Sequence, residues 1–321
     1  MSTVASSTET TLRLGTRGSM LARMQSQMMA DALEKRHKGL RVELIICKTT
    51  GDKIQDRPLH EAGGKGLFTK ELEESLLANT VDFAVHSFKD VPVTMPLVSQ
   101  DNLVIAAVPQ REDPRDVLAS GKARTISELP QGAKVGTGSL RRKCQLLALR
   151  PDLKVELIRG NIDTRVRKLR EGQYDAVILA FAGLKRSGLF VDTDMNPVPT
   201  EEMTPAAAQG ALAIQCRKSD EQTRKLLGVL NDPVTHQCVD LERDLVQSLN
   251  GDCHSPIAAL ATISGKMIDL RVAVGARDGG LPVIRAQAQS EFSEPKKALD
   301  EVMKSLEAQH VHDLLAGKKI S

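Results

Sequence analysis

The chain has 321 residues, of which 41% are hydrophobic and 26% charged, and its net charge is +3 at neutral pH. This length allows two or three domains with separate cores, and the composition is that of an ordinary globular protein. No apolar run approaches the roughly 18 residues that a membrane helix requires. The polar N-terminus lacks the basic start and apolar centre of a signal peptide, so we expect a cytoplasmic protein without a membrane partner.

Strands and helices alternate through the first two thirds of the chain. Apolar runs rich in β-branched residues predict strands at Val42–Cys47, Phe83–Val85, Leu103–Val108, Lys154–Ile158 and Ala176–Phe181. Helices are predicted between them, over Ser19–Lys38, Phe68–Leu77, Ser139–Leu149 and Ile162–Glu171. This order is typical of an α/β fold with largely parallel sheets.

The pattern changes after about residue 231. A predicted helix is followed by three strand-like runs and a last helix, over His236–Leu249, Ile257–Ile263, Ile268–Val274, Val283–Gln289 and Glu294–Glu307. This order predicts a smaller α+β domain with an antiparallel sheet. Proline and glycine near residues 109–114 and 192–205 mark two crossovers or hinges.

The segment from Lys134 to Arg186 is strongly basic. It has thirteen basic and five acidic side chains, an excess of +8 in a chain whose net charge is +3. Proteins that bind nucleic acid usually combine such charge with aromatic side chains, but this chain has no Trp and only one Tyr. We therefore expect small anions such as carboxylates or phosphates rather than nucleic acid. A nucleic-acid-binding regulator is the minor alternative.

Three segments lead from a strand through glycine into a helix and carry arginine: Leu14–Ser19, Gly136–Arg142 and Arg159–Arg165. Backbone N–H groups at such junctions bind anions, and ligands of α/β sheets bind at the carboxyl ends of strands. The arginines following Ser139 lie in a first helical turn, where the helix dipole disfavours cations. Arginine favours bidentate recognition of carboxylate or phosphate. A solvated charged face is the alternative.

Two further segments carry reactive side chains. The run Val81–Pro92 predicts a strand that ends at Lys89 and Asp90, and an ionised acid there could stabilise a cation or move a proton. A turn salt bridge is the alternative. Asn250–Pro256 places Cys253 on a loop, where a thiol is either a nucleophile or a small apolar side chain.

The remaining motifs exclude two kinds of site. Residues 63–68 are glycine-rich but lack the GxxxxGK[ST] spacing, so they favour a flexible lid over a nucleotide loop. The five cysteines are an odd number without Cys-x-x-Cys spacing, which does not favour a disulfide framework or a thiolate zinc cluster. His236 and Cys238 also lack metal-binding spacing, so we expect no metal site.

Six groups of residues, in chain order, resemble the porphobilinogen deaminase family, also called hydroxymethylbilane synthases. They are GGKGLFTKELE, VHSFKDVP, GTGSLRR with RGNIDTR, ILAFAGLKR, PAAAQGALAIQCR and NGDCHSPI. The resemblance begins near Leu12 and covers nearly the whole chain. It implies two lobes like those of type II periplasmic binding proteins and a smaller α+β domain. The expected domains are residues 1–109 with 208–230, residues 110–207, and residues 231–321.

The resemblance also implies a transferase that acts as a monomer. The family condenses four porphobilinogen molecules head to tail, with loss of ammonia at each step, and hydrolysis then releases hydroxymethylbilane. Its cofactor is a dipyrromethane held by a thioether, for which the matching cysteine is Cys253. Porphobilinogen carries an acetate and a propionate, so a growing chain presents many carboxylates to arginine. The alternative is a bilobal binding protein that captures an anionic small molecule without chemistry.

Individual residues match the family's functional positions. Those implied to bind cofactor or substrate are Arg17, Ser19, Lys65, Phe68, Ser87, Lys89, Thr137, Ser139, Arg141, Arg142, Arg159, Arg165, Arg186 and Gln209. Asp90 matches the catalytic aspartate, which is implied to bind pyrrole N–H groups and to stabilise the positive charge left by ammonia loss. Relatives often have Gly-Gly-Cys at the cysteine turn, whereas here Asp252 precedes the cysteine. We expect the turn to tolerate it.

Overall fold

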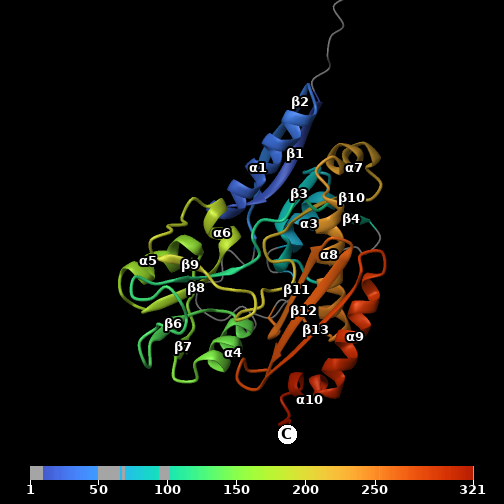
Figure 1. Ribbon diagram of the computed structural model, residues 1–321. Helices are drawn as coiled ribbons and strands as arrows, with labels where there is room; N and C mark the ends of the chain where they lie inside the picture. The colour runs from blue at the N-terminus through green and yellow to red at the C-terminus, as the bar shows by residue number, and fades with distance from the viewer. Residues whose placement is uncertain (1–9, 50–65, 67–68, 94–101, 253, 321) are drawn as a thin grey trace, which may run out of the picture. The chain divides into compact units, whose positions relative to one another are not determined.

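The computed structural model describes residues 10–49, 66, 69–93, 102–252 and 254–320, and Figure 1 shows its elements. The chain divides into two compact units, each built from two separate stretches. The first comprises Met1–Gln110 and Leu212–Pro233, and the second comprises Arg111–Ala211 and Val234–Ser321. The chain therefore passes from the first unit to the second, returns, and leaves again.

The first unit contains a five-stranded sheet in the order β2-β1-β3-β10-β4. Its strands are β1 (Thr10–Arg17), β2 (Leu40–Cys47), β3 (Phe83–Ser87), β4 (Leu103–Ala107) and β10 (Leu212–Arg217). β1 is parallel to β2 and β3, whereas β10 is antiparallel to both of its neighbours, β3 and β4. A strand from the returning chain thus lies inside a sheet formed by the N-terminal part.

Helices cover both faces of this sheet. They are α1 (Met20–Arg36), α3 (Lys70–Leu77) and α7 (Glu221–Gly228), with a short 3-10 helix, η1, at Phe88–Asp90. Because successive strand residues point to opposite faces, Phe83 and Val85 join the core under α1, and Ala84 joins the core under α3. All three side chains are buried. The near-continuous apolar run of β3 is therefore that of a strand buried on both faces.

The second unit contains a second five-stranded sheet, in the order β7-β6-β8-β5-β9. Its strands are β5 (Asp116–Ala119), β6 (Lys134–Gly136), β7 (Lys154–Glu156), β8 (Ala176–Ala180) and β9 (Met195–Pro197). The helices α4 (Leu140–Leu149), α5 (Ile162–Arg170) and α6 (Phe181–Arg186) follow β6, β7 and β8 in turn. β6 is parallel to β7 and β8, whereas β5 is antiparallel to β8 and β9.

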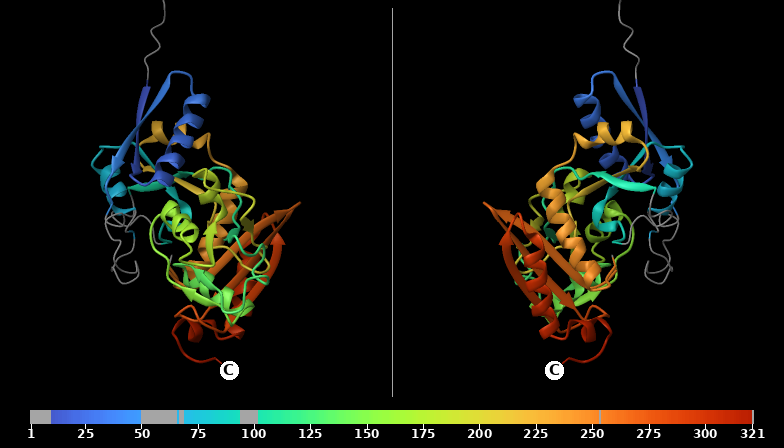
Figure 2. Two further views of the ribbon diagram at one scale, coloured as in Figure 1. Left: turned by 90° about the vertical axis from the view of Figure 1, so that its left-hand side faces the viewer. Right: turned by 90° about the vertical axis from the view of Figure 1, so that its right-hand side faces the viewer.

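The C-terminal part of the second unit is an antiparallel sheet with helices. In chain order its elements are α8 (Pro233–Ser248), β11 (Ile257–Ser264), β12 (Met267–Gly275), β13 (Val283–Glu291), α9 (Pro295–Ala308) and α10 (Val311–Leu315). The sheet order is β11-β12-β13, and α9 packs against β12 and β13, as Figure 2 shows. The apolar side chains of α9 face this sheet, since Leu299, Val302 and Leu306 are buried.

The predicted fold class is confirmed. The chain has two α/β lobes, each with a five-stranded mixed sheet, and a smaller α+β part with a three-stranded antiparallel sheet. Three strands were not predicted: β5, β9 and β10. β5 and β10 are antiparallel to their neighbours in the two large sheets, and β9 lies in the range 192–205 that was predicted as a crossover or hinge. The strand predicted at Lys154–Ile158 ends at Glu156.

A buried carboxylate connects three segments of the second unit. Glu242 of α8 is fully buried, and its oxygens accept from the backbone N–H groups of Ala208 at 2.6 Å and Ala261 at 2.8 Å. The guanidinium of Arg111 donates to the same carboxylate at 2.6 and 3.0 Å. Glu242 thus links α8 to β11 and to both chain segments that enter and leave the α/β lobe.

A buried histidine makes the first unit sensitive to acid. His86 of β3 is 6% exposed, and its Nε2 donates to Oε1 of Gln215 at 3.0 Å. Burial, together with the nearby charge of Arg17, lowers the pKa of His86 to about 4. Because protonation is easier in the unfolded chain, the free energy of unfolding is highest above about pH 6.5 and falls as the pH drops towards 4.

We expect preferential protonation of His86 in the unfolded chain to lower the free energy of unfolding by about 2.5 kcal/mol between pH 7 and pH 4.5. Urea denaturation at both pH values, compared with a His86→Gln variant that cannot titrate there, measures this difference. The variant should lose correspondingly less stability over the interval than the wild type. An equal loss in both proteins would contradict the prediction.

Candidate functional site

Five predicted site residues of the first unit lie at one edge of its sheet. They are Arg17, Ser19, Ser87, Lys89 and Asp90. Leu14 pairs with Phe83 and Gly15 with Ala84, so the parallel strands β1 and β3 lie side by side and end at the same edge. The five residues follow those two carboxyl ends, which is where α/β sheets bind ligands.

Local contacts fix the backbone at this edge. Ser19 is the N-cap of α1, and its Oγ accepts from the N–H of Ala22 at 3.3 Å. The Oγ of Ser87 lies 3.1 Å from the side-chain amide of Gln25, which is buried in α1. Phe88 is buried and anchors η1, while Asp90 at the end of η1 is half-buried. The turn thus holds Asp90 at the surface of the sheet edge.

The second unit has the same arrangement at the carboxyl ends of three adjacent strands. Thr137, Ser139, Arg141 and Arg142 follow β6, Arg159 and Arg165 follow β7, and Arg186 ends the helix after β8. The strand order β7-β6-β8 places these three ends next to one another. The basic segment identified in the sequence therefore places five of its eight arginines at or after the carboxyl ends of neighbouring strands of one sheet.

Glycine is required in one of these turns and is closely packed at the end of the strand before another. Gly160 has a φ of +108°, and a Cβ there would lie 2.6 Å from Cγ2 of Thr164. A Cβ at Gly136 would lie 3.0 Å from the ring of Tyr174. Ser139 and Asn161 occupy the predicted N-cap positions, but neither side chain accepts a helix N–H. The backbone N–H of Ser139 instead donates to Oγ1 of Thr137 at 3.2 Å.

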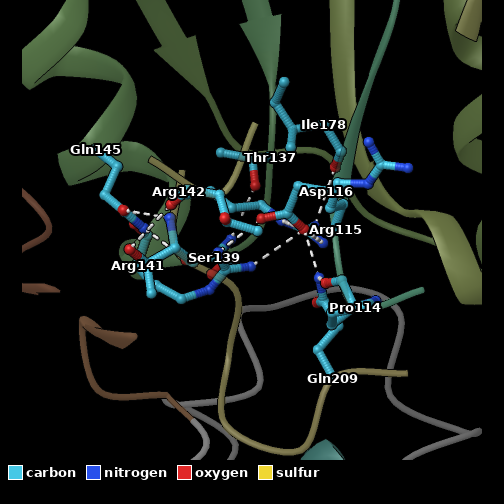
Figure 3. Close-up of polar contacts among 12 residues, drawn as sticks. Pro114, Arg115, Asp116, Thr137, Ser139, Arg141, Arg142, Gln145, Ile178 and Gln209 are labelled. Carbon is cyan, nitrogen blue, oxygen red and sulfur yellow. Dashed lines mark hydrogen bonds and ion pairs between the residues drawn. The ribbon is translucent and has the colours of Figure 1, made fainter. Parts of the chain in front are cut away.

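Arg141 and Arg142 bind a carboxylate of the protein itself, as Figure 3 shows. The Oδ2 atom of Asp116 accepts from Nη1 of Arg141 at 2.6 Å, and Oδ1 accepts from Nη2 of Arg142 at 2.7 Å. The exposed fractions of the three residues are 4% for Arg141, 5% for Arg142 and 0% for Asp116. The two arginines predicted to bind a ligand are thus buried around a third residue that the sequence interpretation did not include.

Gln209 completes this cluster. Its Nε2 donates to Oδ1 of Asp116 at 2.8 Å and to the carbonyl oxygen of Pro114 at 2.7 Å. Burial would raise the pKa of Asp116, but the charges and hydrogen bonds of the two guanidinium groups lower it far below its usual range. The carboxylate is therefore ionised, and the cluster carries one net positive charge.

Two further arginines of this edge, Arg165 and Arg186, donate to backbone carbonyl oxygens, and the backbone of Arg159 accepts from a lysine. Nε of Arg165 donates to the carbonyl oxygen of Gly160 at 2.8 Å, and the carbonyl oxygen of Arg159 accepts from Lys168 at 3.2 Å. Nη2 of Arg186 donates to the carbonyl oxygen of Gly210 at 2.7 Å. Arg167, by contrast, is exposed and pairs with Glu171 at the C-cap of its helix, as expected for surface charge.

Two buried arginine nitrogens have no hydrogen-bond partner within the described part of the chain. They are the Nε atoms of Arg141 and Arg186. A buried donor without a partner is unusual, and a carboxylate is the strongest partner for a guanidinium N–H. This donor set fits an anionic ligand with several carboxylates, such as a dipyrromethane bearing acetate and propionate groups.

Three predicted site residues, Lys65, Phe68 and Cys253, lie outside the described residues. On either side of position 253, Oδ1 of Asp252 accepts from the backbone N–H groups of His254 and Ser255, each at 2.9 Å. It also accepts from Oγ of Ser255 at 3.0 Å. The aspartate that departs from the family pattern is therefore bonded within the cysteine turn.

Among the residues that the structure describes, no helix has the length and apolar composition needed to cross a bilayer. Within those same ranges, no group of three or more His, Cys, Asp or Glu side chains has a geometry suited to a metal ion.

Fold and site together define an α/β protein of two lobes, with arginines gathered after the strand ends of one of them. The chain aligns with solved binding proteins at low similarity. The aliphatic sulphonate binding protein SsuA of Escherichia coli is 15% identical, with 75% of this chain and 70% of that chain covered and a TM-score of 0.37. A methionine-binding lipoprotein of Bacillus subtilis is also 15% identical, with coverages of 70% and 92% and a TM-score of 0.42.

Sequence comparison identifies the family. Residues 12–225 match the porphobilinogen deaminase dipyrromethane cofactor binding domain, and residues 236–308 match the porphobilinogen deaminase C-terminal domain. The porphobilinogen deaminase of Syntrophobacter fumaroxidans is 48% identical over 85% of this chain and 86% of its own length. That of Lawsonia intracellularis is 43% identical over 95% and 97%. The chain belongs to the porphobilinogen deaminase family, as its motifs predicted.

Proposed function

We propose that this protein is a porphobilinogen deaminase, a transferase that condenses four porphobilinogen molecules head to tail and releases ammonia at each step. Hydrolysis then frees the product, hydroxymethylbilane. The observation that carries the proposal is the row of arginines at the carboxyl ends of β6, β7 and β8, within a chain that matches both domains of the family. A polypyrrole with two carboxylates per ring requires such a row.

The arginines bind carboxylates of the cofactor and of the growing chain. This role belongs to Arg17, Arg141, Arg142, Arg159, Arg165 and Arg186, and the other ligand-binding residues are Ser19, Lys65, Phe68, Ser87, Lys89, Thr137, Ser139 and Gln209. Planar guanidinium groups donate two parallel hydrogen bonds to one carboxylate, which fixes its orientation as well as its charge. Each bound ring is thereby held in one position while the next unit is added.

Asp90 acts on the pyrrole nitrogen. Its carboxylate accepts a hydrogen bond from the pyrrole N–H and stabilises the positive charge that develops on the substrate ring as ammonia leaves. A carboxylate fixed at the end of η1 by the buried Phe88 is positioned before the reaction begins. Such preorganisation is the main source of electrostatic stabilisation in enzymes.

The dipyrromethane, when bound, supplies the free pyrrole position to which substrate units are added. The thiol of Cys253 holds it through a thioether. The donor atoms that fit its carboxylates include the two buried Nε atoms described above. The proposal also includes three domains, residues 1–109 with 208–230, residues 110–207 and residues 231–321, in a protein that acts as a cytoplasmic monomer without a nucleic-acid partner.

Intact-mass measurement of freshly purified protein tests the proposal. We expect a mass above that of the polypeptide by two deaminated porphobilinogen units, and a return to the polypeptide mass in a Cys253→Ser variant. The wild type should release ammonia from porphobilinogen, and the variant should not. An active wild type with only the polypeptide mass would refute the cofactor assignment, and protein without mass gain or ammonia release would instead be a binding protein.

A further inference from the structure

We propose that Asp116 is a positioning residue that holds Arg141 and Arg142 as one unit, and that this unit binds a single carboxylate of the dipyrromethane. The inference deepens the proposed function and rests on it. Asp116 touches neither substrate nor cofactor in this proposal, because it is fully buried and acts through the two arginines. The cluster is drawn in Figure 3.

The sheet topology explains why a carboxylate stands at this point. Asp116 is the first residue of β5, and it pairs with Ala180, the last residue of the antiparallel neighbour β8. The start of β5 therefore lies at the same sheet edge as the carboxyl ends of β6, β7 and β8. An antiparallel strand inserted into a parallel sheet thus supplies an acid to the edge that carries the arginines.

The hydrogen bonds fix both guanidinium groups on one carboxylate. Oδ1 of Asp116 accepts from Nε of Arg142 at 3.1 Å in addition to Nη2, and from Nη2 of Arg141 at 3.3 Å. Each arginine also has a backbone anchor: Nη1 of Arg141 donates to the carbonyl of Thr204 at 2.8 Å, and Nη1 of Arg142 donates to that of Ile178 at 3.0 Å. Two acceptors per guanidinium set its plane as well as its position.

A glutamine fixes the backbone segment that anchors Arg141. The Oε1 atom of Gln145 accepts from the N–H of Thr204 at 2.8 Å, and its Nε2 donates to the Thr204 carbonyl at 3.0 Å. The carbonyl that anchors Arg141 is therefore itself fixed. Binding sites held by such supporting contacts lose less freedom when the ligand arrives.

The charges decide how many carboxylates the unit can take. Two buried guanidinium groups repel each other and are costly to desolvate, whereas one carboxylate between them leaves a net charge of +1. One further carboxylate neutralises that charge. The buried Nε of Arg141, which has no partner among the described residues, identifies a donor that remains for it.

The test uses full-length protein purified from cells and compares two substitutions. Asp116→Asn removes the charge with little change in shape. Asp152→Asn is the matched control, because Asp152 of the same unit also pairs with an arginine, Arg150, but lies at the surface. Far-UV circular dichroism and thermal unfolding report folding, and intact mass reports the fraction of protein that carries the cofactor. All masses are measured well below the unfolding midpoint of each variant.

We expect folded Asp116→Asn to carry at least tenfold less cofactor than the wild type, and Asp152→Asn to match the wild type. The apo form of Asp116→Asn, incubated with porphobilinogen, should need at least a tenfold higher concentration for half-maximal mass gain. A purely structural role would lower the unfolding midpoint and leave the cofactor content of the folded protein unchanged. That outcome would overturn the inference.

A double variant covers the case in which Asp116→Asn does not fold. Asp116→Asn combined with Arg142→Gln restores the net charge of +1 without the shared carboxylate. Recovery of folding with a cofactor content below that of the single variant Arg142→Gln supports the inference, because that comparison isolates the contribution of Asp116 to the position of Arg141. A cofactor content equal to that of Arg142→Gln, or failure of the double variant to fold, would contradict it, since Asp116 would then serve the fold and not the position of the arginines. Absence of the cofactor mass from the wild type would instead count against the proposed function.

Discussion

Asp90→Asn is expected to lower turnover by about a hundredfold to a thousandfold while the protein keeps its fold and its cofactor mass. Asparagine has nearly the same shape as aspartate, but it lacks the negative charge that stabilises a cationic pyrrole. The contacts that hold η1 come from Phe88 and the backbone of Val91, and the substitution leaves them in place. The effect should therefore fall on the rate and not on stability.

Ammonia release from porphobilinogen measures this rate, and intact mass shows whether the cofactor is present. Asp31→Asn is a suitable control, because Asp31 is an exposed aspartate of α1 in the same unit and bonds only Gln27 of its own helix among the contacts described here. The control should turn over at the wild-type rate. Near-normal turnover by Asp90→Asn would show that another group stabilises the charge.

Glu242→Gln is expected to lower the free energy of unfolding of the second unit by about 3 to 5 kcal/mol. The substitution leaves the Arg111 guanidinium, which is 11% exposed, without its counter-charge. It also replaces one of two acceptor oxygens by an NH2 group, so one of the backbone N–H groups of Ala208 and Ala261 loses its acceptor. An unsatisfied buried donor adds its own desolvation cost.

Urea denaturation followed by circular dichroism measures the loss. Glu201→Gln is the matched control, since Glu201 also pairs with an arginine, Arg271, but its side chain is 67% exposed. Pairs of that kind contribute about 0 to 1 kcal/mol. A loss below about 1 kcal/mol in Glu242→Gln as well would mean that water reaches the carboxylate.

The helices and strands whose apolar residues recur with a clear period could be predicted from the sequence. The C-terminal strands and α9 lie within a few residues of their predicted ranges, because alternating or helical apolar patterns persist over eight or more residues there. β5 and β10 could not be predicted in the same way. β5 has four residues, all buried, and the first five of the six residues of β10 are also buried, so neither strand shows an alternating pattern.

The residues of the candidate site likewise include some that could be predicted from the sequence and some that could not. The strand-to-helix junctions could be identified from glycine and arginine positions alone, because those turns are local. Asp116 could not, because its partners Arg141 and Arg142 lie 25 and 26 residues further along the chain and meet it only through the sheet order. The roles of Lys65, Phe68 and Cys253 stay predictions, as do the ligand contacts of the other site residues.

The position of β10 also determines which of the two large sheets can be completed first during synthesis of the chain. β10 separates β3 from β4 in the sheet, but it is made more than a hundred residues after them. A nascent chain that stops before Leu212 leaves an unpaired edge on β3 and no neighbour for β4, whereas residues 116–197 already contain every strand of the other large sheet. Pairing β10 with β3 and β4 closes a loop of more than a hundred residues. This costs more chain entropy than closing the shorter loops between the strands of the other large sheet. The lobe that begins the polypeptide is thus completed after the lobe that interrupts it.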